Sequence, residues 1–322
     1  MQKIRLPKGS VGRDFVLIQL KVQGQGPFDF MLDSGLTTEL ITPHLENVLG
    51  IQESGATVTG IAAGGGNTGK LVKLSGASLC CGSFASGNSE LPLPPLYAVV
   101  SDFPQEHLDP NHDPVEGMLG MEMLQLFDAD FDFPKEKLRL WTPGTALSAN
   151  KGLAQIPAAV LNESGLIGIR IISTSQALAQ PMIGIIDCGS SFTIMNWEAA
   201  NIIGLPRDEK FYRDSPSILG VGVDGRPQKL PTTKIQFTFC GDPYSSGDVL
   251  KFSPPPPYWK PWDPVTVGIG DLPVFADLLG DGKTPYKGPA VLVGLDILSQ
   301  RRVIIEAGSS SRRRRLAVAP SA

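Results

Sequence analysis

The sequence contains one pattern twice, and this internal repeat constrains the fold more than any other feature. Residues 26–35, GPFDFMLDSG, align with residues 180–189, QPMIGIIDCG, at a constant offset of 154 residues. The register continues without a gap from residues 47–50, NVLG, to residues 201–204, NIIG. Unrelated segments rarely keep one register over such a length, so the sequence predicts two similar folding units.

Each copy predicts a buried strand that ends at an Asp-x-Gly turn, then a second short strand and a short helix. Thr42 and Asn196 stand where the helix N-caps are expected, and Pro43 suits the first turn of the first helix. Gly50 and Gly204 stand where the chain must leave each helix.

Two later landmarks also repeat, with offsets that change as the intervening loops lengthen. Residues 58–66 and 218–225 predict glycine-tipped hairpins. Residues 117–124, GMLGMEML, match residues 291–298, VLVGLDIL.

The segment at residues 142–151 has the composition of a linker. We therefore expect two β-rich lobes, residues 1–147 with Asp33 and residues 148–322 with Asp187, which also suits a chain of 322 residues.

Composition excludes several classes of protein. The 36 glycines and 28 prolines favour short strands and tight turns, and a net charge of −4 provides no positive field for nucleic acid or anionic lipid. No apolar run approaches the roughly 18 residues of a membrane span. Four cysteines do not make a disulfide framework. We expect an intracellular protein, in the cytosol or in an organelle such as a plastid after removal of a transit peptide.

The ordered motifs resemble those of the aspartic proteases: two apolar residues before Asp-Ser-Gly-x-Thr, then a glycine-rich hairpin, then two apolar residues and a glycine. The chain resembles two-lobed pepsin-like proteases in length, and its compact halves resemble two fused retropepsin-type units. The resemblance implies a mainly all-β, bilobal pepsin-like acid protease fold. Its two β-barrel-like lobes would be related by a pseudo-twofold axis and carry a few short helices.

Asp33 and Asp187 are the candidate catalytic residues. Two carboxylates held face to face cannot both ionise easily, so the pair holds one proton over a wide pH range. The ionised carboxylate can take a proton from a water, and the protonated one can hydrogen-bond a substrate carbonyl.

The resemblance implies supporting roles near these aspartates. Gly35 and Gly189 let each turn fold tightly. The Ser34 hydroxyl braces the two loops against each other, and Thr37 and Ser191 hydrogen-bond the outer carboxylate oxygens.

Gly120 and Gly294 match the glycine behind each loop, where a side chain would clash. The two hairpins would act as flaps over an extended peptide that binds as an added strand. The flap residues are Gly60, Ile61, Ala62, Gly64, Gly220, Val221 and Gly222.

Two positions depart from the family pattern. Cys188 replaces a threonine or serine, so the brace should be weaker on that side, because a thiol is a weak donor. Leu36 stands where many two-lobed members carry a small or hydroxyl residue, and Ser190 at the same place in the second copy fits that pattern. Loss of a hydroxyl at Leu36 should raise the effective pKa of the pair. We therefore expect activity at mildly acidic pH. Neither glycine-rich tip holds a tyrosine or tryptophan, so an aromatic flap contact is not evident.

These observations predict an aspartic endopeptidase that is a monomer, needs no metal or organic cofactor, and binds an extended peptide or protein substrate, with no nucleic acid or membrane partner. The alternative is a catalytically inactive peptide-binding or regulatory protein on the same scaffold.

A second acidic cluster fits neither a calcium site nor a phosphotransfer site. Asp128, Asp130 and Asp132 lack the glycine and glutamate of an EF-hand, and their alternation with apolar residues predicts an edge or surface strand. A phosphotransferase built on Asp128 and Asp130 would need alternating strands and helices and a phosphate-binding loop, which the sequence does not contain.

Overall fold

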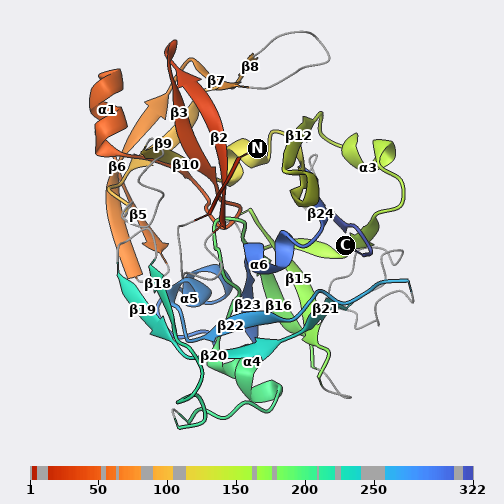
Figure 1. The fold of residues 1–322 in the computed structure, drawn as a ribbon. Helices are drawn as coiled ribbons and strands as arrows, with labels where there is room; N and C mark the ends of the chain where they lie inside the picture. The colour runs from red at the N-terminus through yellow and green to blue at the C-terminus, as the bar shows by residue number, and fades with distance from the viewer. Residues whose placement is uncertain are drawn as a thin grey trace.

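The computed structural model describes most of the chain (Figure 1). The described residues are 2–5, 14–51, 56–62, 65–80, 90–103, 114–161, 165–175, 180–208, 210–221, 226–240, 258–307 and 315–321.

Residues 1–147, called here the first half, contribute a ten-stranded sheet. Its centre joins two parallel pairs of strands, residues 29–32 with 115–119 and 39–41 with 98–100, through an antiparallel contact. The strand order is β5 (Thr57–Ala62), β6 (Gly65–Leu74), β9 (Leu96–Val100), β4 (Glu39–Ile41), β10 (Val115–Leu119), β3 (Gln25–Leu32), β2 (Asp14–Val22), β7 (Ala77–Cys80) and β8 (Glu90–Pro92), while β1 (Gln2–Arg5) pairs with β2.

Residues 148–322, the second half, contribute an eight-stranded sheet with the same central arrangement. Two parallel pairs again meet in one antiparallel contact, β16 with β23 and β17 with β22. The order is β14 (Ala158–Leu161), β15 (Leu166–Ser173), β16 (Met182–Ile186), β23 (Ala290–Val293), β17 (Ile194–Met195), β22 (Val265–Ile269) and β20 (Thr232–Ile235), with β21 (Phe237–Phe239) on β15. The order β9-β4-β10-β3-β2 thus matches β22-β17-β23-β16-β15, which confirms the repeat.

A five-stranded sheet joins the two halves (Figure 1). The strand at residues 128–132, which follows Gly120, pairs antiparallel with the strand at residues 302–305, which follows Gly294. Phe131 lies opposite Val303. The order is β12 (Lys137–Trp141), β11 (Asp128–Asp132), β24 (Arg302–Ile305), β25 (Leu316–Val318) and β13 (Ala154–Ile156). The mainly β, two-unit fold expected from the sequence is therefore present, while the division at residue 147 stays a prediction.

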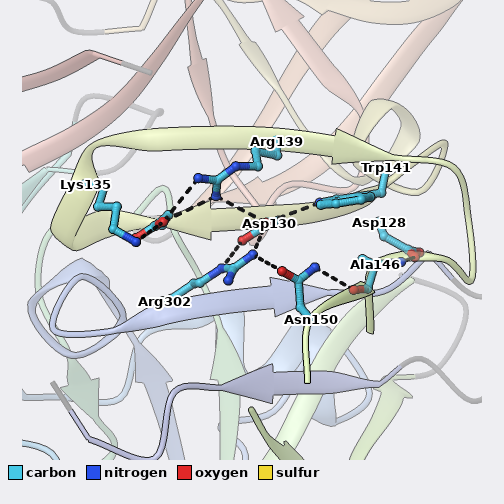
Figure 2. A network of polar contacts seen from close by, with 9 residues as sticks. Asp128, Asp130, Lys135, Arg139, Trp141, Ala146, Asn150 and Arg302 are labelled. Carbon is cyan, nitrogen blue, oxygen red and sulfur yellow. Dashed lines mark hydrogen bonds and ion pairs between the residues drawn. The ribbon is translucent and has the colours of Figure 1, made fainter. Parts of the chain in front are cut away.

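The prediction that residues 128–132 form an edge or surface strand is wrong. Strand β11 lies between β12 and β24, and all five of its residues are buried. Its acidic side chains are fixed by donors from both neighbouring strands: Asp130 accepts hydrogen bonds from Arg139, Trp141 and Arg302, as Figure 2 shows. The acids form a polar layer inside the shared sheet, and they are buried because this layer supplies donors.

The helices are short, and the first confirms the predicted caps. Helix α1 (Pro43–Leu49) begins at Thr42, whose hydroxyl accepts from the Leu45 amide at 3.1 Å, and it ends at Gly50 in the left-handed conformation. The Asn196 side chain caps α4 (Trp197–Ile202) in the same way at 2.9 Å. The others are α2 (Met121–Leu124), α3 (Ala146–Ala149), α5 (Pro273–Leu279), α6 (Leu295–Leu298) and the 3₁₀ turn η1 (Phe133–Lys135).

None of the helices in the described ranges has the length and apolar character needed to span a bilayer.

Candidate active site

Each candidate aspartate directly follows a central strand. Asp33 comes after β3 and Asp187 after β16, and each backbone amide donates to the neighbouring parallel strand, to Leu119 O at 2.9 Å and Val293 O at 3.0 Å. These strands are apolar and are therefore buried in the core. The polar turns that follow them lie at corresponding edges of the two sheets.

The two turns are bonded to each other across the halves. The Ser34 hydroxyl donates to Ile186 O at 3.0 Å and accepts from the Cys188 amide at 2.9 Å. In return, the Cys188 thiol accepts from the Ser34 amide at 3.3 Å and donates to Leu32 O at 3.4 Å. The brace expected at Ser34 has this geometry, and the contacts on the sulfur side are longer.

The two carboxyl groups face each other. A Cβ atom added to Gly35 would lie 2.6 Å from Asp187 Cγ, and one added to Gly189 would overlap Asp33 Cγ. Each glycine therefore packs against the carboxyl of the other half. The requirement for glycine here comes from close approach between the halves.

Backbone amides hold both carboxylates in place. The Gly35 amide donates to Asp33 Oδ1 at 2.7 Å, and the amides of Gly189 and Ser190 donate to Asp187 Oδ1 at 2.9 and 3.1 Å. Burial raises the pKa of both carboxyls, and the neighbouring Asp33 charge raises the pKa of Asp187 further. One proton is therefore retained by the pair well above the ordinary range of an aspartate.

The expected effect of Leu36 on the pKa of the pair stays a prediction. The Ser190 hydroxyl donates to Phe192 O at 2.8 Å, while the Ser190 amide is the group that contacts Asp187. Burial is the largest cause of the raised pKa of Asp33.

Cys188 is a protonated thiol inside this site. Its exposed fraction is 2%, and burial, followed by the Asp33 charge, raises its pKa to about 12. The thiol therefore acts as a weak hydrogen-bonding group and is a poor nucleophile at neutral pH.

The glycines behind the two loops lie where the chains cross. A Cβ on Gly120 would lie 2.5 Å from Leu36 O, and one on Gly294 would lie 2.5 Å from Phe192 O. The next amides hold the loops: Met121 N donates to Leu36 O and Leu295 N donates to Ser190 O, both at 2.8 Å.

The roles expected for Thr37 and Ser191 stay predictions. Thr37 is exposed, whereas Ser191 is buried. Backbone amides and the opposite carboxyl of the pair hydrogen-bond the two carboxylates.

Antiparallel strand pairs occupy the positions of both predicted flaps. Strands β5 and β6 pair Gly60 with Asn67, Ile61 with Gly66 and Ala62 with Gly65. Strands β18 (Ile218–Val221) and β19 (Pro227–Leu230) pair Gly220 with Gln228 and Val221 with Pro227. Gly64 and Gly222 lie outside the described residues.

Two polar groups behind the loops were not predicted from the sequence. In the second half, the Thr193 hydroxyl donates to Asp296 Oδ1 at 2.6 Å and its amide donates to Oδ2 at 3.0 Å. In the first half, Glu39 occupies the position of Thr193 and Glu122 that of Asp296. An acid two residues after each loop glycine is a repeated signal that could have revealed this layer.

The described ranges contain no group of three or more histidine, cysteine, aspartate or glutamate side chains arranged to hold a metal ion.

One segment of the chain matches a known protein family. Residues 18–123, about a third of the chain, match the family model described as aspartyl protease. This segment holds Asp33, Gly120 and the first hairpin, and the second half repeats its strand order and turn. Over this segment the chain is similar to the aspartyl proteases.

Solved structures also resemble the chain. Basic 7S globulin from soybean matches with 10% sequence identity and a TM-score of 0.48, over 100% of this chain and 96% of that one. No curated protein matches the sequence.

Proposed function

We propose that the protein is an aspartic endopeptidase in which Asp33 and Asp187 activate a water molecule for direct attack on a peptide bond. The observation that carries this proposal is the reciprocal packing of Gly35 and Gly189 against the two carboxyls. Groups so close, Asp187 buried and Asp33 half-buried, compete for one proton, which provides a base and an acid at the same place.

The proposed reaction begins with one proton on the pair, placed on Asp187 with Asp33 ionised, because burial and mutual repulsion keep both carboxyls from ionising together. Asp33 takes a proton from the water while the oxygen attacks the carbonyl carbon, and Asp187 hydrogen-bonds the carbonyl oxygen. The tetrahedral intermediate then collapses as a proton passes to the leaving amine, and the aspartates recover their shared proton.

The substrate class proposed is an extended peptide. Each half carries one hairpin, and β5 of the first half contacts α5 of the second half. An extended peptide would pair with backbone groups of such hairpins as an added strand. The hairpins would then exclude water from the scissile bond.

Asparagine substitutions test the proposal, because asparagine keeps the shape of aspartate and cannot carry the proton. Asp33→Asn and Asp187→Asn should each lower kcat for peptide cleavage by at least about 10³-fold. Cleavage by the parent should be sensitive to pepstatin. Peptide binding by a parent protein that shows no turnover would overturn the endopeptidase and favour the inactive peptide-binding alternative.

A further inference from the structure

The two candidate loops rest on different polar supports. In the second half, Asp296 accepts from Thr193, and the Ile297 amide donates to its Oδ1 at 2.9 Å. The Gly294 amide donates to the Thr193 hydroxyl at 3.2 Å. An ionised carboxylate is well solvated by these donors.

In the first half, a buried glutamate occupies the place of the threonine. Glu39 has an exposed fraction of 0%, and its Oε1 accepts from the Met123 amide at 2.8 Å. Its Oε2 is buried and has no hydrogen-bond partner in the described part of the chain. A carboxylate with one oxygen unpaired in the core is costly, whereas a neutral carboxyl is tolerated more easily.

A short path connects this carboxyl to the candidate catalytic loop. Met123 lies in the first turn of α2, whose first residue, Met121, donates its amide to Leu36 O at 2.8 Å. The Leu36 amide donates in turn to Asp33 O at 3.3 Å. Glu39 therefore fixes the helix on which the Asp33 turn rests.

We propose that Glu39 is a positioning residue for Asp33, and that it holds α2 beneath the loop only while its own carboxyl is neutral. In consequence, activity has an upper pH limit, which is set by ionisation of Glu39 in the first half and not by the second half. This inference rests on the proposed function for its effect on catalysis, whereas its effect on the loop can be measured without turnover.

The charges around Glu39 support this assignment. Burial raises the pKa of Glu39 to about 8, and the Glu122 charge on α2 adds to the shift. On β10, the Glu116 carboxylate faces Thr42 and His44 instead. The residue opposite Glu39 on β9 is the apolar Ala98. For comparison, burial raises the pKa of Asp296 only to about 6.

Hydrogen exchange at increasing pH, corrected for intrinsic chemical exchange, tests the positioning directly. Between pH 6.5 and pH 9, peptides covering residues 33–41 and 117–124 of the parent should lose protection by about tenfold. Peptides covering residues 187–195 and 291–298 should not. In Glu39→Gln, which mimics the neutral carboxyl, the first-half peptides should keep their protection.

Glu116→Gln is the matched control, because Glu116 is also a buried glutamate of the same sheet but bonds away from α2. In the Glu116→Gln variant, the first-half peptides should lose protection from hydrogen exchange at high pH, as they do in the parent. Equal loss in the parent and in Glu39→Gln, or equal loss in both halves of the parent, would overturn the inference.

Kinetics at pH 5 supply a second readout. Glu39→Leu, which removes the acceptor for the Met123 amide, should lower kcat about tenfold with KM within about twofold, and Glu39→Gln should restore kcat. Unchanged kcat in Glu39→Leu would contradict the positioning role. A parent without peptidase activity would refute the proposed function alone, since exchange still decides the role of Glu39.

Discussion

The Arg302 guanidinium donates two hydrogen bonds to the Asp130 carboxylate across the two halves, Nε to Oδ1 at 2.7 Å and Nη2 to Oδ2 at 2.6 Å. Arg302 also donates to Asn150 Oδ1 at 2.6 Å, next to the linker helix α3 (Figure 2). One side chain thus connects the first half, the linker and the second half.

We expect Arg302→Met to lower the free energy of unfolding by about 3 kcal/mol, because it leaves Asp130 buried without its main partner. Urea denaturation measures this change. The control is Arg207→Met, which removes an exposed ion pair to Asp271 at 3.5 Å and should cost about 1 kcal/mol or less. Equal losses in both variants would contradict a stabilising role for the Asp130–Arg302 pair.

The thiol of Cys188 can be tested by replacement with serine and with alanine. Alanine leaves Leu32 O and Ser34 N without the partner that sulfur provides, so we expect a loss of about 1–3 kcal/mol in the free energy of unfolding. Serine keeps a donor and an acceptor there and should stay within about 1 kcal/mol of the parent. If alanine were as stable as the parent, the sulfur contacts would contribute nothing.

Gly189→Ala tests the contact between the turns. The added methyl group would overlap the Asp33 carboxyl, so that carboxyl must move. A displacement of about 1 Å at a catalytic group can cost about 10²-fold in rate, which is the loss of kcat expected here. Peptide-cleavage kinetics on a variant shown to be folded by circular dichroism measure it, and full activity would show that the carboxyls are not packed as described.

Stability should fall as the pH rises from weakly acidic to weakly alkaline values. Burial raises the pKa of Glu39 from 4.5 to about 8 and the pKa of Asp296 from 3.8 to about 6. A carboxyl whose pKa is higher in the folded state stabilises the fold below its unfolded pKa, and this contribution is lost as the pH passes through the folded value.

The loss for Glu39 between pH 4.5 and pH 8 is on the order of 5 kcal/mol. Urea denaturation of the parent and of Glu39→Gln across this range isolates it, because glutamine does not titrate. The variant should become the more stable protein near pH 8. A constant difference between the two proteins would contradict the raised pKa of Glu39.

The features predicted from the sequence are those set by local patterns. Apolar runs, cap residues such as Thr42, and loop glycines such as Gly120 each determine structure close to them in the sequence or at a turn that the chain repeats. The repeat then implied that two similar turns meet, and Asp33 and Asp187 do face each other.

The features that were missed depend on contacts between distant segments. Asp130 looked like a surface residue because its burial requires Arg302, 172 residues away, which no periodicity reveals. The protonated state of Glu39 depends on the depth of the core and on Glu122.

The most direct test of the central claim is a carbon-13 NMR titration of the Asp33 and Asp187 carboxyl groups between pH 2 and pH 8. The structure predicts coupled titration, with Asp187 protonated well above the ordinary value of 3.8 and with its pKa lowered when Asp33→Asn removes the neighbouring charge. Independent titration of both groups near 3.8, unaffected by that substitution, would show that the two carboxyls do not share a proton.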